Sequence, residues 1–329
     1  MKVAVLGAGS WGTTLADLLG RKGNEVVLWA FEAEVGRSIN EDHENPLYLP
    51  GARLSPTVTA TSDAVSAVTG AECVVLVSPS HVARRVLSSV APALTEGQLV
   101  VSATKGLEID TLATMSEVAE AVLPSHRFVA LSGPSFAQEV HAGQPTAVVA
   151  ASTDPAASEA AQSLFSTPYF RVYSNRDVIG TELAGSLKNT IAIAAGILDG
   201  LGLGNNPRAA LVTRGLAEMS RLGVAAGADP RTFAGLAGMG DLILTTCGNL
   251  SRNRSLGVAI AQGTSLVQYQ REHRTVAEGV NTARAAVRLA ARHGVETPIA
   301  AKVAEVLFDE KPPRVAIAEL MDRTLKPEL

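Results

Sequence analysis

Lys188 stands in an unusual setting for a charged residue, because its neighbours on the same helical face are mostly small. A helical pattern begins at Thr181, and the Lys188 face of a helical wheel carries Thr181, Ala184, Ala192, Ala195 and Asp199. Small neighbours leave room for a ligand, and partial burial lowers a lysine pKa toward the range where the amine acts as a base. The alternative is a lysine that extends along a helix–helix contact and exposes its ammonium.

Other polar residues are typical of anion binding or acid–base chemistry. Ser251-Arg252-Asn253-Arg254 precedes a helical pattern, where a hydroxyl, a guanidinium and an amide suit a phosphate, although a capped and solvated helix start fits too. Asp241 follows Gly238-Met239-Gly240 in an apolar, glycine-rich stretch, with a helix N-cap as its alternative. Lys105 lies at a strand end on the expected ligand side, where a surface lysine is the alternative.

Gly7-Ala8-Gly9-Ser10-Trp11-Gly12 follows the apolar run Lys2–Leu6 and opens a helical pattern, and a second strand, Glu25–Ala30, comes next. In this spacing Gly7 makes a tight turn, Gly9 lets the backbone approach a pyrophosphate, and Gly12 allows close helix–strand packing. The helix then directs its free N–H groups and positive dipole end at the phosphates. The motif predicts a dinucleotide site, with an ordinary glycine turn as the alternative.

The composition limits the remaining classes. The 329 residues are 47% hydrophobic and 18% charged with a net charge of −4, which indicates globular domains without a basic bias toward nucleic acid. Cys73 and Cys247 show no metal or redox spacing, and the six histidines are scattered, so we expect no metal site. No apolar run reaches the roughly 18 residues of a membrane helix, and no signal peptide precedes the first strand. We expect a cytoplasmic protein.

The elements that position these residues fall into two patterns. From residue 1 to about 180, short apolar runs alternate with amphipathic stretches such as Val82–Ala93 and Leu112–Val122, which predicts βαβ units and a mainly parallel sheet. The clearest strands are Val3–Leu6, Val26–Trp29, Cys73–Val77, Leu99–Ser102, Phe128–Leu131, Ala147–Ala151 and Phe170–Tyr173. Ligands bind outside the carboxyl ends of such strands, and a loop rich in turn residues, His43–Gly51, interrupts the second unit.

After about residue 180 the pattern is helical. The expected helices are Thr181–Leu198, Pro207–Leu222, Ser255–Gln262, Gly279–Arg292, Pro298–Leu307 and Pro313–Arg323. Gly223, Gly263 and Gly294 are expected to end helices. Pro207, Pro298 and Pro313 are expected in the first turns of their helices. The fold class is therefore α/β: a Rossmann-type, doubly wound dinucleotide-binding domain over residues 1–180 and an all-helical substrate-binding domain over 181–329, with a cleft between them.

In combination, these segments resemble the bacterial NAD(P)-dependent glycerol-3-phosphate dehydrogenase family over nearly the whole chain. The segments that carry the resemblance are Gly7–Gly12, Ser102–Glu108, Ser132–Ala137, Gly185–Asn189, Thr213–Leu222, Gly238–Leu244, Ser251–Arg254 and Val276–Gly279. Several segments in the right order are far more specific than any one of them. The resemblance implies interconversion of sn-glycerol 3-phosphate and dihydroxyacetone phosphate with NAD or NADP, a supply of glycerol 3-phosphate for phospholipid synthesis, and a homodimer.

The resemblance also implies roles for individual residues. Lys188 is the implied proton acceptor, with Asp241 beside it. The residues implied around the glycerol phosphate are Lys105, Gly133, Ser135, Lys188, Asp241, Ser251, Arg252 and Asn253. Those implied at the dinucleotide are Gly7, Gly9, Ser10, Trp11, Gly12, Lys105, Ala137, Arg252, Val276 and Glu278.

One departure from the family concerns the end of the second strand. The family usually has Arg or His there, whereas this chain has Phe31 followed by Glu32. A basic residue would neutralise a 2′-phosphate, but an acidic residue about 20 positions past the glycines favours the free ribose hydroxyl of NAD. The departure predicts that NAD is used at least comparably to NADP, unless Arg37 or Arg53 folds over to supply the charge.

Two other functions compete with this one. A ketopantoate reductase-like dehydrogenase also combines a Rossmann domain, a helical domain and a lysine, but it has no obvious need for the Ser251–Arg254 phosphate grip. A dinucleotide sensor without turnover would not need Lys188 on a stripe of small residues with Asp241 nearby.

Overall fold

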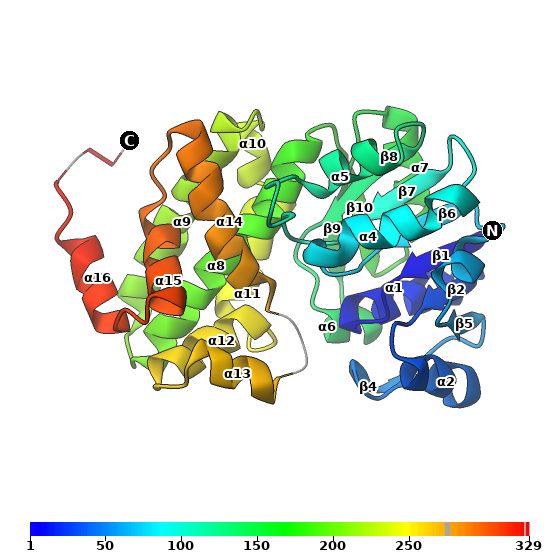
Figure 1. Ribbon diagram of the computed structural model, residues 1–329, viewed down its shortest axis with the longest axis horizontal. Helices are drawn as coiled ribbons and strands as arrows, with labels where there is room; N and C mark the ends of the chain where they lie inside the picture. The colour runs from blue at the N-terminus through cyan, green and yellow to red at the C-terminus, as the bar shows by residue number, and fades with distance from the viewer. Residues whose placement is uncertain (274–276, 326, 329) are drawn as a thin grey trace.

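An eight-stranded sheet organises the N-terminal half of the computed structural model, which describes residues 1–273, 277–325 and 327–328 (Figure 1). The strand order is β10-β9-β8-β7-β6-β1-β2-β5, and every neighbouring pair is parallel except β8 with β9. The strands are β1 (Lys2–Leu6), β2 (Glu25–Trp29), β5 (Val58–Thr61), β6 (Cys73–Leu76), β7 (Leu99–Ser102), β8 (Arg127–Ser132), β9 (Thr146–Ala151) and β10 (Phe170–Asn175). The predicted parallel-dominated sheet is confirmed.

Helices cover both faces of this sheet, because its central strands are apolar on both sides. In β1, Val3 and Val5 belong to one core cluster, whereas Ala4 and Leu6 belong to another. The first cluster includes residues of α1 (Ser10–Arg21), α2 (Ala33–Asp42), α6 (Ala137–His141) and α7 (Pro155–Phe165). The second includes residues of α3 (Ala64–Val68), α4 (Ser80–Val90) and α5 (Met115–Val122), and a 3₁₀ turn, Ala91–Ala93, follows α4. The sheet is therefore doubly wound.

Some local elements differ from the prediction. The edge strand β5 was missed, and the expected loop His43–Gly51 contains part of a hairpin between β3 (Glu44–Asn45) and β4 (Leu49–Arg53). The helix expected from Leu112 begins only at Met115. Leu112 has a left-handed backbone (φ 65°), and a capping box between Thr114 and Glu117 fixes the later start.

All regular structure described after Asn175 is helical (Figure 1). The helices are α8 (Val178–Gly200), α9 (Asn205–Ala225), α10 (Pro230–Phe233), a π-helical turn η2 (Leu236–Gly240), α11 (Asp241–Cys247), α12 (Arg252–Ala261), α13 (Leu266–Glu272), α14 (Glu278–His293), α15 (Pro298–Phe308) and α16 (Pro313–Met321). Helix α8 is buried along nearly its whole length and packs on α9, α11, α12 and α14. A domain boundary at residue 180 stays a prediction.

Glycines in the helical half have two different uses. Gly263 and Gly294 lie just after α12 and α14 with positive φ, as predicted for helix stops. Gly223 does not stop α9, so this prediction was wrong. A Cβ there would lie 2.1 Å from Cζ of Phe233, so Gly223 is needed for close packing inside the helix.

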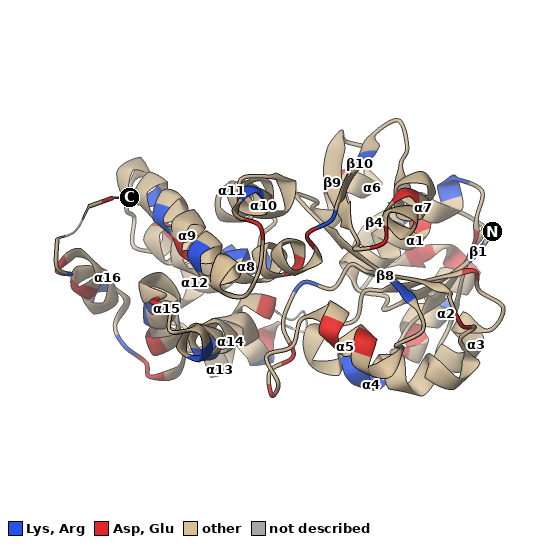
Figure 2. Cartoon of the chain, turned by 90° about the horizontal axis from the view of Figure 1, so that it is seen from above, with Lys and Arg blue, Asp and Glu red and all other residues tan. Residues whose placement is uncertain are grey.

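Charged residues of both signs are interspersed over both halves of the molecule, and α9 carries both along its length (Figure 2). In the described part of the chain, no helix combines the length and apolarity needed to cross a membrane.

Candidate active site

The glycine turn between β1 and α1 has the geometry that a dinucleotide phosphate needs. Gly7 has a φ of 131°, and a Cβ there would lie 3.0 Å from the backbone of Val77 and Ser78. A Cβ at Gly12 would lie 1.8 Å from the carbonyl oxygen of Gly7, so only glycine lets α1 start this close to β1. Beside Gly9, in contrast, no atom of the described chain lies within 4 Å of a Cβ position. The residues present therefore fit a pyrophosphate over Gly9 at the N-terminus of α1.

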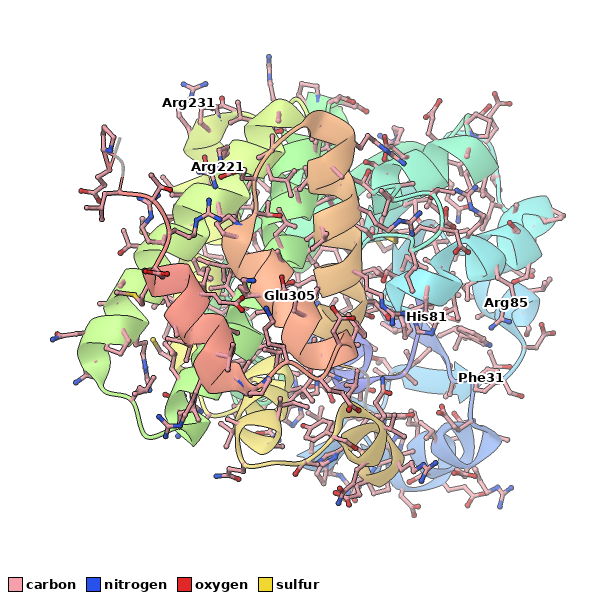
Figure 3. All side chains as sticks on the ribbon, turned by 60° about the vertical axis from the view of Figure 1, so that its left-hand side comes forward. Phe31, His81, Arg85, Arg221, Arg231 and Glu305 are labelled. Atoms are coloured by element: carbon pink, nitrogen blue, oxygen red, sulfur yellow. The ribbon has the colours of Figure 1, made fainter. Side chains whose placement is uncertain are left out.

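Glu32 lies at the end of β2, where a dinucleotide presents its adenosine ribose. Its Oε1 accepts a hydrogen bond of 2.6 Å from the hydroxyl of Tyr48, which fixes the carboxylate. The backbone oxygen of Tyr48 also accepts a 2.5 Å bond from Ser10 Oγ in the glycine turn. Phe31 is 77% exposed and stands at the surface of the nucleotide half (Figure 3). An acidic group is thus held at the ribose end.

Glu278 approaches the nucleotide half from the first turn of α14. Its Oε2 accepts a 3.0 Å hydrogen bond from Ser80 Oγ at the start of α4. Burial raises the pKa of Glu278, while the bonds from Ser80 and the charge of Arg252 oppose the shift.

Ala137 lies beside α1, because its carbonyl oxygen accepts a hydrogen bond from Thr14 Oγ1 at 3.2 Å.

Two other residues implied at the dinucleotide give less information. Trp11 packs its ring 6.4 Å from Phe170, and its indole N–H has no hydrogen-bond partner in the described part of the chain. Val276 lies outside the described residues.

Lys188, Asp241 and Lys105 form one charged cluster where the two halves meet. Lys188 Nζ donates to Asp241 Oδ1 at 3.0 Å, and Lys105 Nζ donates to Oδ2 at 2.7 Å. Lys105 also donates to the carbonyl oxygen of Gly133 at 2.9 Å. The side chains of Lys188 and Asp241 are 8% and 2% exposed, while that of Lys105 is 18% exposed. One carboxylate therefore holds two ammonium groups side by side.

The electrostatics of the cluster suit proton transfer at Lys188. Burial, aided by the positive charges of Lys105 and Arg252, lowers the pKa of Lys188 to about 8 although Asp241 opposes the shift. Burial alone raises the pKa of Asp241, but the two lysines outweigh it and hold that pKa below its usual value. Lys188 is thus poised to exchange a proton near neutral pH beside a permanently charged carboxylate.

These contacts decide between the alternatives left open by the sequence. Lys188 does not extend its ammonium to solvent, and Asp241 makes no side-chain cap at α11, whose N-cap is Gly240. The expected open space along the Lys188 stripe is wrong. Thr181, Ala184, Ala192 and Ala195 are all 0% exposed, because neighbouring helices pack closely around α8. The side of the helix around Lys188 is therefore occupied by protein, and the Lys188 ammonium lies against Asp241.

In the Ser251–Arg254 segment, Ser251 and Arg254 stabilise the fold, whereas the side chain of Arg252 is available for a ligand. Ser251 caps α12 by accepting from the Arg254 N–H at 3.3 Å, and Arg254 donates to Asp199 at 2.6 Å. The side chain of Arg252, in contrast, makes no hydrogen bond or ion pair with any other described residue. Arg252 is exposed to solvent, and desolvation by the protein around its guanidinium lowers its pKa although the charge of Glu278 opposes the shift. Its guanidinium is the group available for an anion.

Asn253 is buried and serves first as a structural tie. Its Nδ2 donates to Asn189 Oδ1 at 2.9 Å, and its Oδ1 accepts from the Gly279 N–H at 2.9 Å. These bonds join α8, α12 and α14. Among the described residues, the second hydrogen of Nδ2 has no acceptor.

Gly133 and Ser135 complete the rim beside Lys105. Gly133 has a φ of 137°, and a Cβ there would lie 2.9 Å from Val148 Cα, so glycine is required. Ser135 Oγ donates to the Gly133 carbonyl oxygen at 3.0 Å, the same atom that accepts from Lys105.

Sequence reasoning missed four supporting residues. Tyr48 orients Glu32, Ser80 binds Glu278, and Asn189 orients Asn253. A Cβ at Gly185 would lie 2.5 Å from Ser132 Oγ and 3.9 Å from Lys105 Cγ, so this glycine lets α8 approach the sheet. Only Asn189 carried a signal, as an amide inside a helix that must find a partner.

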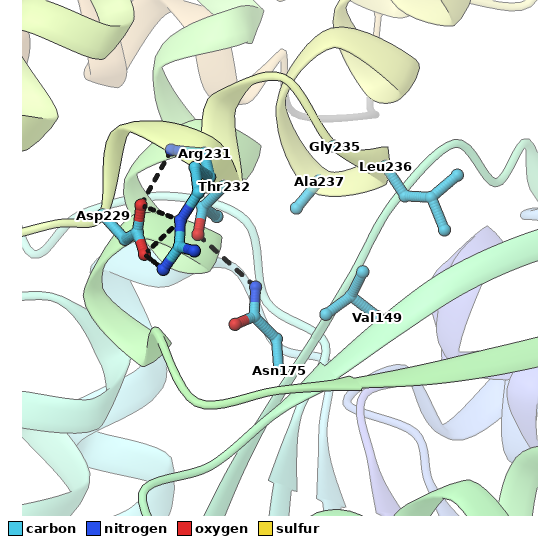
Figure 4. A pocket seen from close by; sticks show the side chains of 8 residues that line it. All are labelled: Val149, Asn175, Asp229, Arg231, Thr232, Gly235, Leu236 and Ala237. Carbon is cyan, nitrogen blue, oxygen red and sulfur yellow. Dashed lines mark hydrogen bonds and ion pairs between the residues drawn. The ribbon is translucent and has the colours of Figure 1, made fainter.

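A cavity of about 330 Å³ also lies between the sheet and the helical half, but away from this cluster (Figure 4). Its lining residues are Val149, Asn175, Asp229, Arg231, Thr232, Gly235, Leu236 and Ala237. Arg231 is paired with Asp229, and Asn175 donates to Thr232 Oγ1 at 3.4 Å. The cavity therefore contains none of the three residues of the lysine–aspartate cluster.

Comparisons with known proteins match nearly the whole chain to one kind of enzyme. Family models described as NAD-dependent glycerol-3-phosphate dehydrogenase N-terminus and C-terminus match residues 2–158 and 177–318. The chain is 58% identical to a glycerol-3-phosphate dehydrogenase [NAD(P)+] of Geobacter sulfurreducens, with 99% of this chain and 98% of the relative covered.

Solved structures give the same result. The crystal structure of glycerol-3-phosphate dehydrogenase from Coxiella burnetii has a TM-score of 0.95 at 39% identity, with 98% of this chain and 99% of that chain covered. A ketopantoate reductase from Ralstonia eutropha has a TM-score of 0.63 at 20% identity, over 98% of this chain and 100% of that chain, and shares the fold alone. On these matches and its full-length identity to curated relatives, the chain belongs to the NAD(P)-dependent glycerol-3-phosphate dehydrogenase family.

Proposed function

We propose that this protein interconverts sn-glycerol 3-phosphate and dihydroxyacetone phosphate with NAD or NADP, as the names of its relatives suggest. The observation that carries the proposal is the buried Lys188–Asp241–Lys105 cluster facing the nucleotide half. In the reductive direction the product is the glycerol phosphate backbone of phospholipids.

The turn Gly7–Gly12 would hold the dinucleotide, with Glu32 toward its ribose and Glu278 as a further contact from α14. When bound, the dinucleotide supplies a hydride to C2 of the ketone or accepts one from C2 of the alcohol. The chain supports this chemistry by enclosing the reacting carbon and by handling the proton that accompanies the hydride.

Lys188 handles that proton. In reduction, the Lys188 ammonium donates its proton to the carbonyl oxygen of dihydroxyacetone phosphate as C2 gains the hydride, which leaves a neutral amine and an alcohol. In oxidation, the neutral amine takes the hydroxyl proton as C2 loses the hydride. Asp241 keeps Nζ in place through the 3.0 Å bond and stabilises the ammonium form.

The phosphate is bound by positive charge at the rim of the cluster. Arg252 has no other partner in the described chain, and Lys105 is shared between Asp241 and the Gly133 carbonyl oxygen. Ser135, Ser251 and Asn253 add hydroxyl and amide donors at the helix and loop ends. A dianionic substrate thus meets more positive than negative charge.

The direct test mixes purified protein with NADH and dihydroxyacetone phosphate and follows absorbance at 340 nm. We expect turnover that unphosphorylated dihydroxyacetone does not match. Absence of turnover with NADH, and with NADPH in a parallel assay, would contradict the proposal and favour a dinucleotide-binding sensor.

The proposal also covers cofactor preference, location, oligomeric state and domain division. Phe31 and Glu32 support use of NAD at least comparable to NADP. Two free cysteines, one buried at Cys73 and one exposed at Cys247, are compatible with the reducing cytoplasm. A homodimer rests on the family resemblance, and light scattering of the purified protein tests it. The division into domains 1–180 and 181–329 rests on the change from sheet to helices.

A further inference from the structure

The loop between β7 and α5, Lys105–Thr114, connects the candidate site with a distant part of α14. Lys105 at its first position faces Asp241, as described above. The rest of the loop leaves the sheet and lies against helices of the C-terminal half (Figure 1). Leu107 and Leu112 are 2% and 4% exposed, in a core cluster with Leu187 of α8 and Leu289 of α14.

Two arginines of α14 hold this loop by its backbone. Arg288 donates to the carbonyl oxygens of Ile109 and Asp110 at 2.6 and 3.1 Å, and Arg292 donates to that of Thr111 at 3.0 Å. Three successive carbonyls are therefore bound by two guanidinium groups one helical turn apart. Exposed arginines have no need of such partners, because water solvates them well.

The loop touches α14 a second time beside Lys105. A Cβ at Gly106 would lie 2.5 Å from Ser80 Oγ and 3.0 Å from Glu278 Oε2, so Gly106 packs directly on that hydrogen-bonded pair. Glu278 begins α14, whereas Arg292 lies near its end. The loop and the helix are thus fastened at both ends.

The backbone next to these contacts has an unusual conformation. Leu112 adopts a left-handed φ of 65°, which an apolar residue adopts only when its surroundings impose it. Glu108 forms a paired hydrogen bond with Arg84 of α4 at 2.7 and 2.8 Å, so the opposite side of the loop is also held. Movement of this loop would move Lys105 relative to Asp241.

We propose that Arg288 and Arg292 are positioning residues for Lys105: by holding the loop carbonyls 109–111 on α14, they fix the Lys105 ammonium between Asp241 and the Gly133 carbonyl oxygen. This inference rests on the proposed contact of Lys105 with the substrate. It gives α14 a role at the substrate end of the site in addition to the Glu278 contact.

The test is a double-mutant cycle between these arginines and Lys105, with KM for dihydroxyacetone phosphate as the readout. Arg288→Ala with Arg292→Ala should raise that KM by roughly 5–20-fold, because charged donors to the loop carbonyls are lost. In a Lys105→Met background the same pair should change KM for dihydroxyacetone phosphate by less than about twofold. Arg284→Ala, on α14 but stacked on Phe308, is the matched control and should match the parent.

Several outcomes would overturn the inference. An arginine effect of equal size in the Lys105→Met background would indicate a merely structural role. An unchanged KM in Lys105→Met alone would remove the proposed substrate contact and this inference with it. Circular dichroism and thermal melting check the fold. If the alanine pair unfolds, Arg288→Gln with Arg292→Gln keeps the side-chain stems and enters the same cycle.

Discussion

The two halves of this molecule build their parts of the site in different ways. In the nucleotide half, the phosphate position is a backbone feature made by residues within Gly7–Gly12: Gly7 is explained by its φ, Gly12 by a close contact, and Gly9 by the open space beside it. Where the helical half meets the nucleotide half, the reactive group is a side-chain cluster in which Asp241 meets partners 53 and 136 residues away. A backbone site depends on local spacing, whereas a charged cluster depends on how the whole chain folds.

The largest effect should come from breaking the side-chain cluster at its centre. Lys188→Met should retain dinucleotide binding but lose at least roughly 10³-fold in turnover, because both proton transfer and carbonyl polarisation are lost. Stopped-flow or steady-state rates with NADH and cofactor binding by fluorescence measure the two separately.

Lys188→Arg is the matched control for charge. A guanidinium keeps the positive charge beside Asp241 but does not release a proton in this pH range. We expect it to be nearly as inactive as the methionine variant. Activity of Lys188→Met within about tenfold of the parent would remove Lys188 from the mechanism.

A smaller effect should follow from removing the free guanidinium. Arg252→Ala should raise KM for dihydroxyacetone phosphate by roughly 10–150-fold, since a charge-assisted hydrogen bond contributes about 1.5–3 kcal/mol. It should also reduce the preference over unphosphorylated dihydroxyacetone. Parallel steady-state kinetics with both substrates measure this.

Arg254→Ala provides the comparison, because both arginines lie in the first turn of α12 but Arg254 is bound to Asp199. Arg254→Ala should lower the thermal midpoint of unfolding but leave KM for dihydroxyacetone phosphate close to that of the parent. If Arg252→Ala keeps the full phosphate preference, the anion contact lies elsewhere, and Lys105 is the next candidate.

The smallest effect concerns the ribose end of the nucleotide half. Phe31→Arg with Glu32→Ser should shift preference toward NADPH, because a like charge near the 2′-phosphate costs about 1–3 kcal/mol. The ratio of kcat/KM for NADH and NADPH measures it, and Glu34→Ser is the control because Glu34 is exposed two positions further on. A parent enzyme that favours NADPH by tenfold or more would contradict the prediction.

The same contrast explains what the sequence could predict. The alternation of strands and helices, the glycine turn and the helix stops at Gly263 and Gly294 depend on local rules, and the structure confirms them. Asp241 was identified as a candidate, but its N-cap alternative could not be dismissed until both lysines were placed beside it. The prediction of open space beside the small residues around Lys188 was wrong. Small residues allow close approach of either a ligand or a neighbouring helix, and here helices pack against them.

Failures on local structure have physical causes as well. Gly223 looked like a helix stop, but the contact that requires it comes from Phe233 in a different helix. The hydroxyl of Tyr48 and the amide of Asn189 orient site residues through bonds that span 16 and 64 positions. Such contacts are set by tertiary packing, so neither periodicity nor composition predicts which partner each side chain meets.

The most direct test of the account is the pH dependence of kcat/KM in both directions, with the parent enzyme and saturating cofactor. Burial and nearby cations lower the pKa of Lys188 to about 8, so the ammonium needed for reduction is lost above that pH, and the amine needed for oxidation is gained. Between about pH 7 and 10, reduction of dihydroxyacetone phosphate should therefore fall and oxidation of glycerol 3-phosphate should rise around a common midpoint near 8. Two flat profiles, or two that change in the same direction, would contradict the assignment of Lys188 as the residue that carries the proton.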